Sequence, residues 1–302
     1  MKRNLGFFVL LVSVVAMSTA ATAQNNSCDR QCLVQMLDRY LDRMLAHDPA
    51  GVPMAATANI RELTAPVKLG EGGSWTKVTK LRTRQVFADP LQGNVEYRGA
   101  VDTGSSLSSL SIRLKVENRR ITEVESVLNQ GERPFDAEYL LEPDPFLESV
   151  LPAGRRLTRE EMIKVANNYF EAIGTHDPGA ANFAKRCERF ESGWKITHNK
   201  LGANGSAEGG DHSCAESLAA LRGQQTINRR FPIVDVERGI VSGMTFIQHQ
   251  EAMPQYALYM HELFKIVDGK LWSIDNIAHR VAWPPHSGFG QTVTTAYTPS
   301  GK

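Results

Sequence analysis

The chain has 302 residues, with 34 basic and 33 acidic side chains and a formal net charge of +1 at pH 7. A nearly neutral chain without a basic run argues against nucleic acid and against an anionic membrane surface as the main partner. The length fits two domains of ordinary size, each of which can bury a hydrophobic core.

The N-terminal segment has the features of a secretory signal peptide. Lys2 and Arg3 precede a short apolar run over 5–16, and Ala21-Thr-Ala23 forms a small-residue cleavage site. Cleavage there removes both charges and leaves 32 basic against 33 acidic residues, a net charge of −1. No later stretch reaches the roughly 20 apolar residues that a membrane-spanning helix needs. We therefore expect a secreted or periplasmic chain from which residues 1–23 are removed.

Four cysteines in an exported chain indicate disulfide bonds rather than a metal site. Cys28 and Cys32 are four residues apart, whereas Cys187 and Cys214 bracket a Gly-rich stretch. Of the three possible pairings we favour 187–214, which closes this stretch, and by elimination 28–32. A zinc site made of all four cysteines is the alternative, although paired CxxC knuckles are missing.

The first predicted helix covers 32–44, where apolar residues recur every three or four positions. They are Leu33, Met36, Leu37, Tyr40, Leu41 and Met44. Asp48-Pro49 fits an N-cap followed by proline at the first helical position, which predicts a short helix through Met54-Ala-Ala56. Alternating or β-rich runs then predict four strands, at 81–88, 94–101, 108–117 and 120–128.

Residues 130–157 have four prolines and no clear period, and are predicted to link two domains. Thr158 and Glu161 have the spacing of a capping box at the start of a second amphipathic helix. A polar, Gly-rich stretch over 199–212 follows, and then a short predicted helix over 215–221. Four more strands are predicted near 226–235, 240–248, 257–267 and 271–279. The tail, 282–302, is rich in Pro, Gly, Ser and Thr, and is either disordered or laid over the domain surface.

The two halves of the chain repeat one another. Both helices end in Tyr, apolar residues and then His-Asp-Pro, and His47 and His176 differ by 129 positions. Two further anchors match at offsets of 146 and 150: Asp89-x-x-x-Gly93-x-Val95 with Asp235-x-x-x-Gly239-x-Val241, and Leu114-Lys-Val116 with Phe264-Lys-Ile266. The offset grows where the second copy has its Gly-rich insert. The sequence therefore predicts two copies of one domain.

The order of a long helix, a short helix and a curved antiparallel sheet resembles the NTF2-like (SnoaL-like) cone fold. The chain is most similar to secreted proteins with paired SnoaL-like domains. The motifs that carry the resemblance are Cys28-Asp-Arg-x-Cys32, the two His-Asp-Pro turns, Phe87-Ala-Asp-Pro90, Arg230-Phe-Pro-Ile-Val-Asp235 and Glu262-Leu-Phe-Lys-Ile266. The resemblance implies an α+β fold with tandem NTF2-like domains at 28–129 and 158–281, each with a mostly apolar pocket between helix and sheet. The superfamily includes isomerases, dehydratases, epoxide hydrolases and polyketide cyclases, and also non-catalytic binding modules, so the fold alone does not name an activity.

Glu262 is the principal candidate for a catalytic residue. On its predicted strand it shares a face with Leu258, Met260, Phe264 and Ile266, and the first-copy equivalent at offset 150 is the apolar Ile112. A carboxyl on an apolar face is costly to ionise, so its pKa should rise into the range useful for acid–base catalysis. The alternative is a carboxyl that is hydrogen-bonded for structural reasons, or a misjudged register.

Two further residues are predicted to assist. His249 ends a strand on the face of Val241, Thr245 and Ile247 and could shuttle protons, although an ordinary strand-end residue fits equally. Tyr169 lies on the apolar helical face and could donate its hydroxyl to an oxyanion. A core tyrosine with a satisfied hydroxyl is the alternative, and Tyr40 has the same interpretation in the first copy.

Other polar groups have stronger structural interpretations. His47-Asp48 and His176-Asp177 look like repeated dyads, but aspartate before proline is typical of a cap. Arg229-Arg230 with Asp235 could form a charged cluster at a pocket mouth or a solvated hairpin end, and the second is favoured. His261 and His279 are weaker candidates, because the faces on which they lie are ambiguous.

These observations lead to two functional hypotheses. The first is an exported, cofactor-independent enzyme, a lyase or an isomerase, that performs elimination, hydration or isomerisation on a small, largely apolar molecule. The second copy would carry the site and the first would be structural. The second hypothesis is a non-catalytic module that binds a small molecule or a protein. No metal motif, phosphate-binding loop, nucleophile elbow or dinucleotide fingerprint is present in the sequence. In either case the two cones could pack through their sheets as a built-in dimer, which predicts a monomer in solution.

Overall fold

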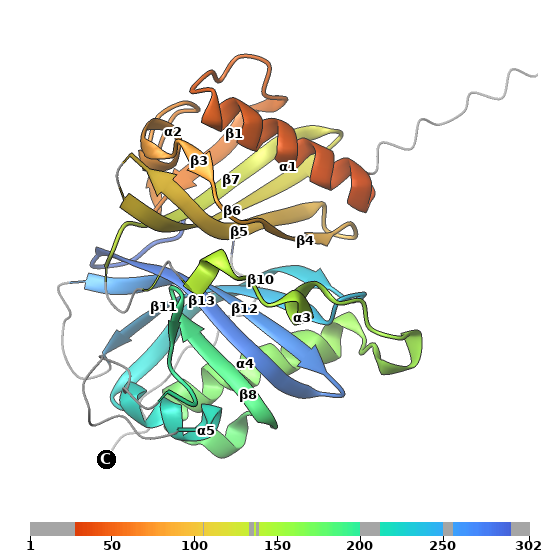
Figure 1. Ribbon diagram of the computed structural model, residues 1–302, viewed down its shortest axis with the longest axis vertical. Coiled ribbons are helices and arrows are strands. Elements are labelled where there is room, and N and C mark those ends of the chain that lie inside the picture. The colour runs from red at the N-terminus through yellow and green to blue at the C-terminus, as the bar shows by residue number, and fades with distance from the viewer. Residues whose placement is uncertain are drawn as a thin grey trace, which may run out of the picture.

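The computed structural model describes residues 28–104, 106–132, 136, 139–199, 212–249 and 256–290. The predicted signal peptide, 1–23, and most of the Gly-rich insert lie outside these residues. Two units of helix and mixed sheet account for almost all of the described chain (Figure 1). The predicted α+β class with two tandem copies is confirmed.

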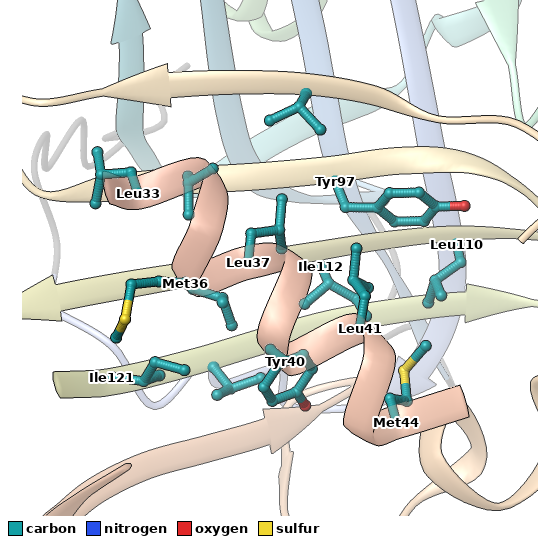
Figure 2. Packing of buried hydrophobic residues seen from close by; sticks show 14 of the residues in the cluster. Leu33, Met36, Leu37, Tyr40, Leu41, Met44, Tyr97, Leu110, Ile112 and Ile121 are labelled. Atoms are coloured by element: carbon teal, nitrogen blue, oxygen red, sulfur yellow. The ribbon is translucent and has the colours of Figure 1, made fainter. Parts of the chain in front are cut away.

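The first unit begins with the long helix that the sequence predicts. Its elements are α1 (Arg30–Leu45), β1 (Met54–Glu62), β2 (Ala65–Pro66), α2 (Gly73–Lys77), β3 (Lys80–Leu81), β4 (Gln85–Asp89), β5 (Asn94–Thr103), β6 (Ser106–Glu117) and β7 (Arg120–Asn129). Asp29 caps α1 by accepting a hydrogen bond from the backbone of Cys32. The six apolar residues of the predicted helical face are all buried. Figure 2 shows this face of α1 packed on Tyr97, Leu110, Ile112 and Ile121 of the sheet.

The second unit follows a linker that contains α3 (Pro145–Glu148). Its elements are α4 (Arg159–Thr175), β8 (Phe183–Glu191), β9 (Trp194–Lys195), α5 (Cys214–Ser217), β10 (Gln224–Asp235), β11 (Ile240–His249), β12 (Tyr256–Val267) and β13 (Lys270–Ala282). The predicted capping box is present, because Thr158 and Glu161 bond each other's backbone N–H groups. The linker is not a bare spacer, since Leu140, Leu147 and Leu151 are buried.

The two sheets have the same strand order, which confirms the repeat. The first runs β2-β1-β7-β6-β5-β3, with β4 also paired to β5, and the second runs β9-β8-β13-β12-β11-β10. The strand registers agree with the sequence offsets. Val95 pairs with Leu114 across the hairpin of the first unit, and their repeat equivalents, Val241 and Phe264, pair in the second. One pair in each sheet, β1 with β7 and β8 with β13, is parallel, so the predicted antiparallel sheet is correct only in part.

The predicted helix through Met54-Ala-Ala56 is wrong, because these residues begin β1. Met54 pairs with Ile121 of β7, and the carbonyl of Pro53 accepts the N–H of Ile121. Three residues are too few to nucleate a helix by themselves, so the ladder to β7 decides their conformation. Neither β1 nor β8 has a counterpart among the predicted strands.

The repeated Asp-x-x-x-Gly-x-Val motif forms the turn before the central hairpin of each unit. Gly93 and Gly239 have φ of +66° and +64°. A Cβ on either would lie 2.4 or 2.3 Å from the carbonyl oxygen of Val116 or Ile266, so only glycine fits both positions. The same turn directs its aspartate toward the other unit.

The units pack sheet against sheet, with α1 and α4 on the outer faces (Figure 1). Asp89 of the first unit accepts hydrogen bonds from Arg159 at 2.5 Å and from the backbone N–H of Val234 at 3.0 Å. Asp235 of the second unit accepts from Arg30 at 2.7 Å and from the N–H of Ala88 at 3.5 Å. Because these partners are repeat equivalents, the contacts are related by a local two-fold axis. Asp235 is therefore neither at a pocket mouth nor at a solvated hairpin end.

A band of buried charges crosses the middle of the interface between two apolar clusters. Glu125 of β7 binds Arg113 of its own unit at 2.9 Å, and it also binds Arg230 and the hydroxyl of Tyr259 from the second unit. Both predictions for Arg230 are therefore wrong. The sequence does not reveal that Arg230 is buried, because its partner Glu125 lies 105 positions away.

Residues 283–290 of the tail lie over the seam between the units. The Phe289 ring is 5.0 Å from the guanidinium carbon of Arg113 and 5.3 Å from that of Arg230. The Asn59 amide donates to the carbonyl of Gly288 at 2.9 Å. Of the two predictions for the tail, the one that lays it over the surface is correct for these residues. Among the helices that the structure describes, none combines the length and the apolar composition needed to cross a membrane.

Both predicted disulfide pairings, Cys28–Cys32 and Cys187–Cys214, are confirmed. Since all four cysteines are paired, the alternative of a zinc site made of them is excluded.

The two disulfides should differ in their effect on stability. The bonded cysteines are 4 residues apart in the first disulfide and 27 residues apart in the second. A disulfide that closes a longer loop removes more conformational entropy from the unfolded chain. We expect a double Cys187→Ala/Cys214→Ala variant to lose about 3.5 kcal/mol of unfolding free energy, against about 2 kcal/mol for Cys28→Ala/Cys32→Ala. Urea denaturation of both variants measures the difference, and equal losses would contradict this ranking.

Candidate functional site

Five polar residues meet on the helix-facing side of the second sheet. We call them the polar patch: Tyr169, Arg189, Glu191, Glu262 and Asn276. Register places Glu262 of β12 opposite Asn276 of β13, and Asn276 beside Glu191 of β8. The three side chains therefore form a row across adjacent strands that lie about 4.8 Å apart. Tyr169 projects from α4 onto the row, as the sequence predicts.

Arg189 ties the helix to the row. Its Nε donates to the hydroxyl of Tyr169 at 3.0 Å, and its Nη2 pairs with Glu191. Its backbone N–H donates to Thr197 at 2.9 Å, which fixes the strand at this position. The side chain is only 3% exposed, so the guanidinium is a desolvated cation whose hydrogen bonds are strong.

Glu262 is buried in this environment, on the predicted face. Burial raises its pKa to about 8, although Arg189 opposes the shift, while Glu191 adds to it. Its Oε1 has no hydrogen-bond partner among the described residues. At neutral pH Glu262 is therefore mostly a neutral acid that can give up a proton.

Tyr169 is also fully buried, and burial raises its pKa above the ordinary value for tyrosine. The phenol therefore stays neutral over the physiological range. Because its oxygen accepts from Arg189, its own proton remains available to a second acceptor. The ring packs edge-on against Phe264 and Phe183.

The first unit provides a comparison within the same chain. At offsets of 129 and 150 the equivalents of the patch are Tyr40, Ile60, Glu62, Ile112 and Ser126. Glu62 caps α2 by accepting from the backbone of Gly73 at 2.5 Å and of Ser74 at 3.0 Å. Tyr40 accepts from the indole of Trp75 at 2.7 Å. Arg189 and Glu262 thus stand where the first unit has isoleucines. Glu191 and its equivalent Glu62 are both glutamates, but Glu62 caps a helix whereas Glu191 pairs with Arg189.

The structure brings Glu262 and Tyr169 together near Arg189. His249, in contrast, ends the neighbouring strand β11, and its backbone lies far from the patch. Gly243 of β11 stands opposite Glu262, and the backbone of His249 lies roughly 20 Å further along that strand at about 3.4 Å per residue. The side chain of His249 lies outside the described residues, and its role stays a prediction.

The remaining candidates have structural roles. Asp177 accepts from the backbone N–H of Gly179 and caps the 3-10 helix Pro178–Ala180, as the cap interpretation predicts. Asp48 accepts from the N–H of Ala50 in a turn, but the helix that it was expected to cap is the strand β1. His261 faces the interface, where its Nδ1 lies 2.7 Å from the hydroxyl of Ser111. Burial lowers the pKa of His261 to about 4.

Two more of these residues bind neighbouring structural elements. Nδ1 of His279, near the end of β13, lies 3.3 Å from the Glu132 carboxylate. Arg229 pairs with Glu171 of α4, which also contradicts both predictions for the arginine pair.

Arg189, Glu191 and Asn276 were missed from the sequence. The strand β8 that carries the first two reads Phe183-Ala-Lys-Arg-Cys-Glu-Arg-Phe-Glu191, which has no alternating pattern. The offset of 129 could have aligned Glu191 with Glu62 and Arg189 with Ile60. Within the described ranges, no group of three or more His, Cys, Asp or Glu side chains is placed to hold a metal ion.

Comparison with known proteins gives a family model and a set of similar folds. Residues 155–278, which contain the whole patch, match a family described as a domain of unknown function, DUF8021. A search of curated proteins finds no match.

Three solved structures are similar to one unit's length of the chain. A putative ketosteroid isomerase from Kribbella flavida is 14% identical, covers 45% of this chain and 92% of its own, and has a TM-score of 0.29. An NTF2-like protein from Burkholderia xenovorans is 16% identical, covers 40% and 92%, and has a TM-score of 0.28. A designed protein with a curved β-sheet is 12% identical, covers 33% and 87%, and has a TM-score of 0.29.

Proposed function

We propose that the protein is an exported, cofactor-independent enzyme that performs acid–base chemistry on a small, largely apolar molecule. Elimination, hydration and isomerisation are the reactions that the site supports. The observation that carries the proposal is the polar patch, which is packed among apolar residues between α4 and the second sheet and has no equivalent set in the first unit. The proposal takes 1–23 as a cleaved signal peptide and 28–129, 130–157, 158–281 and 282–302 as first domain, linker, second domain and tail.

The role that we propose for each residue follows from its surroundings. Glu262 is neutral and gives a proton to a leaving or carbonyl oxygen, while the Tyr169 hydroxyl donates to the same developing charge. Glu191 is paired with Arg189, and its carboxylate oxygens can accept a proton. Two carboxyl groups in different electrostatic environments are a recurring basis for acid and base roles. His249 is proposed to assist at the rim.

The alternative is a module that binds a ligand without changing it. The first unit favours this, because Ile112 and Ile60 leave its sheet face apolar where the second unit is charged. A ligand that is recovered chemically unchanged after long incubation would support this alternative.

Glu262→Gln tests the enzymatic proposal. Once a screen of small carbonyl and hydroxyl compounds by mass spectrometry finds a turnover, we expect the variant to lower kcat by about 10²–10⁴-fold, the usual contribution of a positioned acid or base. Glu117→Gln, an exposed change on β6 of the first unit, is the matched control and should leave kcat unchanged. Equal turnover by wild type and Glu262→Gln would remove Glu262 from the mechanism.

A further inference from the structure

The patch does not end at the edge of the second unit. Next to Asn276 and Glu191 is a cavity of about 10 Å³, which is close to the space that one water molecule occupies. Its walls also include Ser192 of the second unit, and Asn129 and Glu132, which belong to the end of the first unit and the start of the linker. The remaining walls are the apolar Leu258 and Ala278.

Asn129 lines this cavity and holds the turn that follows Glu191. Its Nδ2 donates to the hydroxyl of Ser192 at 3.2 Å and to the carbonyl of Ala278 at 2.9 Å. Its Oδ1 accepts from the backbone of Gly131 and Glu132, so the same side chain also shapes the linker. Asn129 is 1% exposed and fully bonded. The first unit therefore fixes the position of the strand end that carries Glu191.

One wall of the cavity has an unsatisfied polar atom. Asn276 is 3% exposed, and its Nδ2 points toward the sulfur of Met260 at 3.9 Å, while its Oδ1 has no donor among the described residues. A buried carbonyl oxygen without a donor costs free energy, and protein interiors usually satisfy such groups with an ordered water. The hydroxyl and the two carboxyl groups on the cavity wall are further partners for a water.

From this geometry we infer that the cavity binds one ordered water, which donates to Oδ1 of Asn276, and that the first unit completes the site of the second through Asn129. Asn129 is a positioning residue, because it acts on Glu191 and Asn276 through Ser192 and Ala278. The tandem arrangement is then part of the site, in contrast to the expectation that the first copy is only structural. The inference extends the proposed site and so rests on the proposed function, but its test needs no substrate.

The test combines a crystal structure with hydrogen exchange on the full mature chain. We expect the wild-type crystal structure to show one water within hydrogen-bond distance of Oδ1 of Asn276. In Asn129→Ala, exchange of the N–H groups of Ser192 and Ala278 should accelerate by at least about ten-fold, because their local structure opens more easily. Asp89→Asn, which removes the negative charge from the inter-unit contact at the opposite end of the interface, is the matched control and should leave these two rates unchanged.

Three outcomes would overturn the inference. They are a dry cavity in the wild-type crystal structure, unchanged exchange in Asn129→Ala, and equal acceleration in Asp89→Asn. The wild-type crystal structure decides the question of the water even if Asn129→Ala does not fold. Since neither measurement uses turnover, a failure here is distinct from loss of the enzymatic proposal, which the Glu262→Gln kinetics decide.

Discussion

Replacing Glu125 by glutamine is expected to destabilise the protein by about 3–5 kcal/mol, the usual cost of removing one partner from a buried ion pair. Burial alone would raise the pKa of Glu125, but the guanidiniums of Arg230 and Arg113 outweigh it and hold this pKa well below the ordinary value. The side chains of Glu125, Arg113 and Arg230 are 2%, 2% and 4% exposed. The variant therefore leaves the buried guanidiniums of Arg113 and Arg230 without the carboxylate that they share. Urea denaturation measures the loss of unfolding free energy.

Two further variants show whether the cost comes from the uncompensated charge. Glu117→Gln breaks a solvent-accessible pair with Lys115 of the same strand, β6, and should cost less than about 1 kcal/mol. Adding Arg230→Met to Glu125→Gln should restore part of the lost stability, because it removes one of the stranded cations. A Glu125→Gln variant as stable as wild type would show that the charged band does not hold the two units together.

Glu262 should make the protein less stable as the pH rises. Its folded pKa, about 8, lies above the unfolded value of 4.5, so the folded state holds its proton longer than the unfolded state does. Stability from this group is fully present below pH 4.5, declines as the unfolded chain ionises, and levels off above pH 8. The full difference is on the order of 5 kcal/mol, because one pKa unit corresponds to about 1.4 kcal/mol.

Glu262→Gln isolates this effect. Glutamine cannot ionise, so the variant should lose the part of the pH dependence that Glu262 contributes and should gain on wild type steadily between pH 5 and pH 8. Unfolding free energies from urea denaturation across this range measure the difference between the two proteins. A difference that does not change with pH would mean that Glu262 has an ordinary pKa in the folded protein.

The parts of the fold that the sequence predicts are those with local signals. The face of α1 reports burial directly, because its apolar side chains pack within their own unit. The alternation in β6 and β12 predicts the strands but not their burial, because the polar face of each strand is buried against the other unit. The strands β1 and β8, each next to a two-residue edge strand, lack such alternation. Lys185 and Arg186 of β8 are exposed, and its buried Arg189 bonds Tyr169 and Glu191. Such partners are set by the tertiary fold, which propensity cannot foresee.

The site shows the same limit. Comparing the two copies singled out Glu262, because a carboxyl replaced an isoleucine at an equivalent position on an apolar face. Asn276 could not be found that way, because its equivalent Ser126 is also polar and gives no contrast. Arg230 was misjudged for a related reason: an arginine is expected in solvent unless its partner is known, and Glu125 comes from the other unit.

The central claim is that the patch of the second unit holds a carboxyl protonated at neutral pH. The most direct measurement is a pH titration of glutamate carboxyl carbons by NMR in the labelled mature protein, with Glu262→Gln used to assign the signal. The account predicts that the Glu262 signal titrates with a midpoint near 8, well above the other glutamates. A midpoint near 4.5, the ordinary value, would contradict the account, because Glu262 would then be an ionised carboxylate with no proton to give.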